Sequence, residues 1–96
     1  MEFGVQFFPS VGPETTPAHQ YFDEALRLTE QSEALGFTNV RTVEHYFHHY
    51  GGYSPNPLIF LAAAAARTTT MRLITGAVLP VFNHPLKHAS GIAMIE

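Results

Sequence analysis

Short apolar segments alternate with longer helix-like segments along the chain, and this alternation restricts the fold more than any other sequence feature. The predicted strands are 3–8, 38–43 and 71–79, and the predicted helices are 17–35, a segment that opens at 56–57, and 85–96. Such alternation is typical of βαβ units and a parallel sheet. The third strand is apolar along most of its length, as in strands buried on both faces. We therefore expect an α/β fold with three parallel strands.

A proline marks the start of each predicted helix. Thr16, Asn56 and His84 each precede a proline. A polar N-cap followed by proline at the first helical position is favoured, because that position needs no N–H group. We expect Thr16 and Asn56 to cap their helices and Gly36 to follow the end of the first helix. The second helix, with Leu58 to Ala66 apolar throughout, is expected to pack on more than one face.

Composition limits the classes of partner. With 96 residues, the chain forms one small domain at most. A charged fraction of 14% and a formal net charge of −3 disfavour nucleic-acid binding. The absence of cysteine excludes disulfides and cysteine-based zinc sites. No secretory signal is recognised, and the longest apolar run is far shorter than the roughly 20 residues of a membrane span. A soluble cytoplasmic protein is the expectation, with no membrane partner.

The last residues lack the usual signals of a helix end. The segment 91–96 is mostly apolar and has neither a C-cap glycine nor a polar tail. Three apolar parallel strands also leave the edges of their sheet uncovered. We therefore expect residues 1–96 to be part of something larger, either the remainder of a domain or a homo-oligomer.

The second predicted strand ends in a dense group of polar and aromatic residues. Glu44, His45, His48 and His49 lie within six positions, with three tyrosines beside them. The group is a metal site, the lining of a ligand pocket, or a chance cluster. A helix would bring the acid and the histidines onto one face, but Gly51-Gly52 favours a loop, and the zinc-protease pattern His-Glu-x-x-His is absent. No metal site is therefore predicted.

Aromatic residues surround the same strand ends. Tyr46, Phe47, Tyr50 and Tyr53 are expected to form a polar, aromatic loop that covers a pocket, with polar tips on the tyrosines. Phe7 and Phe8 end the first strand. We expect one of these two rings in the core and the other in the pocket, and the sequence does not say which.

Five motifs carry a resemblance to a known family. They are Phe3-Gly4, Leu35-Gly36-Phe37, Val43-Glu44-His45, Asn56-Pro57, and Thr75 to Pro80 followed by Asn83-His84-Pro85. In this order and spacing the sequence resembles the N-terminal portion of the bacterial luciferase-like monooxygenases, a flavin-dependent family built on a (β/α)₈ TIM barrel. Such a barrel needs roughly 250 residues. The resemblance implies that residues 1–96 supply about three of the eight βα units, an incomplete barrel without the later strands. Those strands carry the family's arginine-containing flavin phosphate site and much of its substrate pocket.

The resemblance implies roles for particular residues. His45 would lie near the reactive face of the flavin and donate or accept protons, which suits an imidazole, and Glu44 would orient groups deeper in the mouth of the barrel. A non-prolyl cis peptide against the flavin ring would lie at Thr75-Gly76 or its neighbour, so Thr75, Gly76 and Ala77 are predicted to bind the cofactor. The alternatives are an ordinary strand end at His45, and a glycine at position 76 that makes room for a neighbouring side chain.

The implied activity is that of a flavin-dependent monooxygenase. Reduced FMN, supplied by a separate reductase, and dioxygen would oxidise a small organic substrate. One alternative within the superfamily is an oxidoreductase that uses a deazaflavin coenzyme. Another is a catalytically silent fragment that acts as an oligomerising or interaction module.

Overall fold

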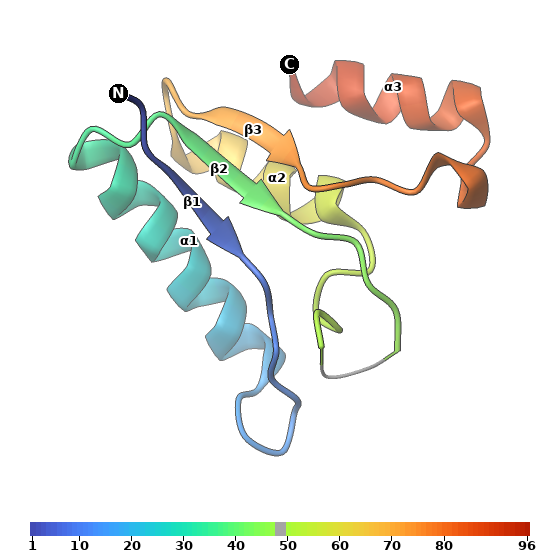
Figure 1. Cartoon of the computed structure of the whole chain (residues 1–96), viewed down its shortest axis with the longest axis horizontal. Helices are drawn as coiled ribbons and strands as arrows, with labels where there is room; N and C mark the ends of the chain where they lie inside the picture. Colours follow the sequence, from blue (N-terminus) through green and yellow to red (C-terminus); the bar gives the residue numbers. More distant parts are fainter. Residues whose placement is uncertain (48–49) are drawn as a thin grey trace.

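The computed structural model describes residues 1–47 and 50–96. Three strands form one parallel sheet in the order β1-β2-β3 (Figure 1). The strands are β1 (Gly4–Phe7), β2 (Asn39–Thr42) and β3 (Arg72–Thr75), and the helices are α1 (Ala18–Ala34), α2 (Pro57–Arg67), the 3₁₀ helix η1 (Pro80–Phe82) and α3 (Pro85–Ile95). The predicted order of strands and helices is confirmed.

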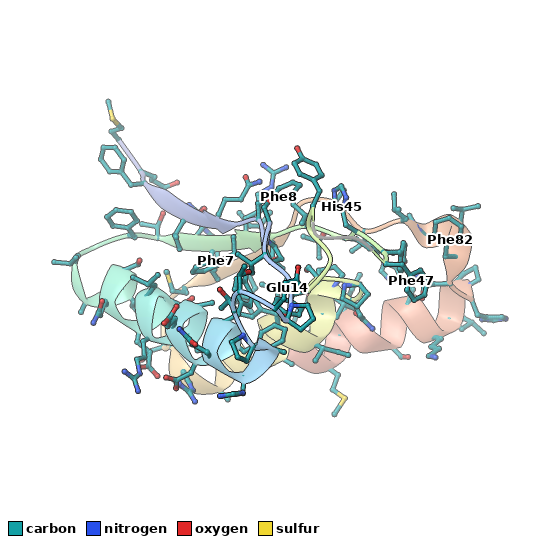
Figure 2. The ribbon with its side chains drawn as sticks, turned by 90° about the horizontal axis from the view of Figure 1, so that it is seen from below. Phe7, Phe8, Glu14, His45, Phe47 and Phe82 are labelled. Carbon is teal, nitrogen blue, oxygen red and sulfur yellow. The ribbon has the colours of Figure 1, made fainter. Side chains whose placement is uncertain are left out.

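The sheet has one covered face and one open face. Val5, Val40 and Leu73 lie in register on the face that α1 and α2 cover, and Figure 2 shows the helices on one side of the sheet. The alternate row is Gln6, Arg41 and Ile74. Ile74 is 39% exposed. The prediction that β3 is buried on both faces is therefore wrong for this chain, because only a complete barrel encloses the inner face of its strands.

The core lies between the sheet and the first two helices. Val40 and Ala64 are fully buried, and Leu61 is almost so. Ile59 on α2 is 70% exposed. The prediction that α2 packs on more than one face is nevertheless confirmed, because the helix contacts β2 and β3 of the sheet and also α1 and α3.

The helix ends agree with the sequence at two positions and differ at one. Asn56 Oδ1 accepts a hydrogen bond from Leu58 N–H at 3.2 Å, as expected for an N-cap. Gly36 has a φ of +91°, and its N–H donates to Glu33 O in the loop after α1. Thr16, however, is not the N-cap of α1; Pro17 takes that position without a side-chain hydrogen bond. The reason is a turn in which Thr16 N–H donates to Gly12 O, so that the helix starts later.

Glu33 joins the end of α1 to the loop before β3. Its carboxylate accepts hydrogen bonds from the backbone N–H groups of Thr69, Thr70 and Met71 at 3.0–3.1 Å. These donors, Thr70 first, lower the pKa of Glu33 below its ordinary value of 4.5.

We expect Glu33→Gln to lower the urea midpoint of unfolding at pH 7 and to have a smaller effect at pH 3. The folded pKa is the lower one, so the stabilisation is present above about pH 4.5 and is lost as the pH falls through the folded value. Glu30→Gln is the matched control, because Glu30 pairs with Arg67 at 3.7 Å between exposed side chains, where an ion pair contributes little. Equal midpoints for Glu33→Gln and the wild type at pH 7 would contradict this account.

Candidate active site

The carboxyl ends of the three strands meet at one edge of the sheet, where barrel enzymes place their chemistry. Phe8 follows β1, His45 follows β2 after a short extension, and Gly76 and Ala77 follow β3. The predicted site residues therefore lie on adjacent strand ends.

His45 is held in an aromatic group. Its ring centroid lies 5.1 Å from that of Phe8 and 5.6 Å from that of Tyr50, and the Phe8 and Tyr50 centroids are 4.5 Å apart. The His45 backbone N–H donates to Ser54 O at 2.9 Å. Figure 2 shows Phe8 and His45 on the side of the sheet away from the helices. The imidazole therefore has a fixed backbone and a partly apolar surrounding.

The two phenylalanines at the end of β1 have different roles. The Phe7 ring packs on Phe60 of α2, with centroids 5.5 Å apart, and belongs to the core side of the sheet. Phe8 contacts His45 instead. The structure thus decides which of the two rings lies at the candidate site.

Gly51 lies against the His45 side chain. A Cβ atom on Gly51 would lie 2.8 Å from both Cβ and Cγ of His45, and the φ of Gly51 is +78°. Its N–H donates to Pro9 O at 2.9 Å, which links this loop to the end of β1. Glycine is therefore required here both by the backbone conformation and by the position of the imidazole.

The Glu44 side chain is buried, with an exposed fraction of 8%. One carboxylate oxygen accepts from the Tyr46 hydroxyl, and the other accepts from Leu79 N–H at 2.8 Å. Glu44 therefore links the end of β2 to the segment after β3. A direct contact between Glu44 and a cofactor stays a prediction.

The segment after β3 contains a cis peptide bond between Gly76 and Ala77. The predicted position was Thr75-Gly76 or its neighbour, and the neighbouring bond is the one found. Gly76 also makes room for a side chain: a Cβ atom there would lie 2.1 Å from Nε of Arg41. Both explanations offered for this glycine therefore have support, and cofactor binding by Thr75, Gly76 and Ala77 stays a prediction.

Two features of the site went unrecognised in the sequence. Arg41 projects from the open face of β2 across Gly76, and it is the one charged residue in an otherwise uncharged predicted strand. Ser54 is 4% exposed, and its hydroxyl donates to Val43 O at 2.5 Å. Arg41 had a visible signal; Ser54 had none.

The aromatic loop does not act as one cover. Tyr53 packs on Tyr21 and Phe22 of α1, and its hydroxyl donates to Thr16 O at 2.7 Å. Among the ring pairs of the described residues, Tyr50 is the loop tyrosine that contacts His45. His48 and His49, part of the metal hypothesis, lie outside the described residues, and the described residues contain no group of three metal-binding side chains.

Comparison with known proteins decides the family. The family model described as luciferase-like monooxygenase matches residues 1–96. The chain belongs to this family. Its three βα units match the N-terminal part of a luciferase-like TIM barrel, which the described residues leave incomplete.

Solved structures of family members superpose closely on the chain. Monooxygenase RslO1 from Streptomyces bottropensis has a TM-score of 0.95 and 63% identity, covering 99% of this chain and 29% of its own. The oxygenating constituent of 3,6-diketocamphane monooxygenase from Pseudomonas putida, a type II Baeyer-Villiger monooxygenase in complex with FMN, has a TM-score of 0.88 and 30% identity, covering 99% of this chain and 26% of its own.

A curated relative also matches in sequence. The oxygenase component of flavin-dependent trigonelline monooxygenase from Acinetobacter baylyi is 34% identical over 77 residues, covering 80% of this chain and 21% of that relative. The chain thus spans about a fifth of this relative's length. Among the described residues, none belongs to a helix long and apolar enough to cross a membrane.

Proposed function

We propose that the chain supplies the N-terminal three βα units of an FMN-dependent monooxygenase that oxidises a small organic substrate with dioxygen. The observation that carries this proposal is the placement of His45 and the Gly76-Ala77 segment at one edge of a sheet that superposes on a relative in complex with FMN. A cytoplasmic location stays part of the proposal.

The residues at the strand ends suit a flat aromatic ligand. The exposed Ala77 carries only a methyl group, next to Gly76, whose Cβ position is taken by the Arg41 side chain, and the ring of His45 is only partly covered. Phe8 and Tyr50 would exclude water from one side of the imidazole, and His45 would move a proton at a ring nitrogen. Bound reduced FMN would supply the electrons for dioxygen chemistry.

The source of reduced FMN is proposed to be a separate reductase. Two relatives have names that describe an oxygenase component and an oxygenating constituent. Such names support an enzyme that receives its reduced flavin from another protein.

A second candidate function is an interaction module that does not turn over by itself. The open inner face around Ile74 favours it, and so do the exposed apolar side chains of Ile59 on α2 and Met94 on α3. We propose that these surfaces are covered either by the rest of a barrel or by another copy of the chain.

The test is a titration with cofactor. We expect an oxygenase barrel that contains this chain, in place of the matching segment of the Streptomyces bottropensis monooxygenase, to bind FMN and to consume dioxygen when reduced FMN is supplied. Binding and oxygen uptake are measured by fluorescence quenching and with an oxygen electrode, and the unmodified relative is the control. Tight binding of a deazaflavin coenzyme in place of FMN would support the superfamily alternative. The interaction module would be supported by two results together. The barrel that contains this chain would bind neither FMN nor a deazaflavin coenzyme, and the chain alone would self-associate in ultracentrifugation.

A further inference from the structure

Glu44 is the one buried acidic side chain among residues 1–47 and 50–96. A buried carboxylate is costly unless hydrogen bonds replace its lost water. The structure supplies one donor to each oxygen: the Tyr46 hydroxyl to Oε1 and the Leu79 N–H to Oε2. The carboxylate is therefore committed to protein donors from two different segments.

The hydrogen bond from Leu79 N–H to Glu44 holds the segment that follows β3. Leu79 follows the Gly76-Ala77 cis peptide by two residues and directly precedes η1. The last ladder bond of β3 runs from Gly76 N–H to Thr42 O. Beyond that bond, Glu44 is the side chain that holds this segment to β2.

Tyr46 holds the same carboxylate from the other side. Its ring lies at 88° to that of Phe82 in η1, with centroids 5.8 Å apart, so it contacts the segment that Leu79 opens. The hydrogen bond to Glu44 is the main cause that raises the pKa of Tyr46 above 10.0. The phenol therefore remains a proton donor to Glu44 at neutral pH.

His45 follows Glu44 directly in the chain. The Glu44 carboxylate accepts from Leu79 N–H, while the His45 ring contacts Phe8 and Tyr50. Both side chains extend from one short stretch of backbone, so a carboxylate that is held at Glu44 restricts where the His45 backbone can lie.

We propose that Glu44 and Tyr46 form a positioning pair that sets His45 and the Gly76-Ala77 peptide at a fixed distance and orientation. The geometry of the pair is independent of any cofactor, and only its consequence for oxygenation rests on the proposed function. Glu44 acts through Leu79 and His45, and Tyr46 acts through Glu44; neither is a catalytic residue.

The test uses the chain itself and three variants: Glu44→Gln, Tyr46→Phe and the control Glu24→Gln. The control makes the same chemical change on an exposed side chain of α1. Amide exchange is followed by NMR, tyrosine ionisation by ultraviolet absorbance, and the His45 ring by its proton shifts, which depend on its place beside Phe8 and Tyr50.

We expect Glu44→Gln to accelerate exchange of the Leu79 amide about tenfold, because the bond from that amide loses its charged acceptor. We also expect it to shift the His45 ring protons and to move the ionisation of Tyr46 to lower pH. Tyr46→Phe is expected to shift the His45 ring protons and to remove that tyrosine transition while the chain stays folded, since it deletes one hydroxyl. Glu24→Gln is expected to change none of these.

Unchanged Leu79 exchange in Glu44→Gln would overturn the proposal, and so would His45 shifts that stay at wild-type values in both Glu44→Gln and Tyr46→Phe. Neither result depends on flavin. An oxygenase barrel that fails to bind FMN would therefore count against the proposed function and leave this pair intact.

Discussion

Replacing His45 by alanine is expected to lower oxygenase turnover about 10²- to 10⁴-fold, the usual contribution of a positioned acid or base. The expectation rests on the place of His45 at the strand ends beside Phe8 and Tyr50, on the same edge as the Gly76-Ala77 peptide. Turnover is measured as oxygen uptake by the barrel that contains this chain, with reduced FMN and a substrate of the relative.

His19→Ala is the control for this experiment. His19 is an exposed residue in the first turn of α1, so its replacement removes an imidazole without touching the strand ends. Unchanged turnover in His45→Ala would remove the catalytic role. Flavin titration of the same variant would then show whether His45 contributes to binding, because a lost contact raises the dissociation constant while kcat stays the same.

Replacing Gly51 by alanine is expected to destabilise the fold and to displace the His45 ring. The positive φ of Gly51 costs an alanine about 1–2 kcal/mol. The added methyl group also overlaps His45 Cβ and Cγ, and overpacking of this kind costs a further ~1–3 kcal/mol. Urea unfolding gives the first effect. The nuclear Overhauser contact between His45 and Phe8, which should weaken, gives the second.

Gly36→Ala separates the two contributions. Gly36 has a φ of +91°, but apart from its own atoms and its two chain neighbours no atom of the described residues lies within 4 Å of the place where its Cβ would be. This variant should lose only the conformational part and leave the His45–Phe8 contact intact. Equal losses for the two glycine variants, with an unmoved His45, would show that Gly51 and His45 do not constrain each other.

The sequence predicts the start or end of a helix correctly where that boundary depends on backbone groups only a few residues away. Asn56-Pro57 starts α2, His84-Pro85 starts α3, and Gly36 ends α1. Each depends on backbone groups within a few residues, which the sequence displays. Thr16 was misread because a turn from Gly12 competes for the same backbone, and the hydrogen bond from Tyr53 to Thr16 O comes from 37 positions away.

The candidate site shows the same division. The motif of Glu44 and His45 and the position of the cis peptide followed from a family resemblance. The partners of Glu44 did not, because Leu79 offers a backbone N–H that no residue type reveals. Likewise, only the fold shows that Phe8 and not Phe7 contacts His45, and that Tyr53 packs against Tyr21 of α1. The open face of β3 was mispredicted because burial of that face depends on a closed barrel, which the three described strands do not form.

The register of the sheet has a consequence for how the chain folds. Gly4 pairs with Asn39, and Asn39 pairs with Arg72, so each pairing closes a loop of about 35 residues. Loop-closure entropy grows only with the logarithm of loop length, so it gives neither pairing an advantage in rate. We therefore expect the order of strand pairing to depend on the apolar burial that α1 and α2 provide, so that a substitution in the core face of one helix would slow the strand pairing that this helix covers.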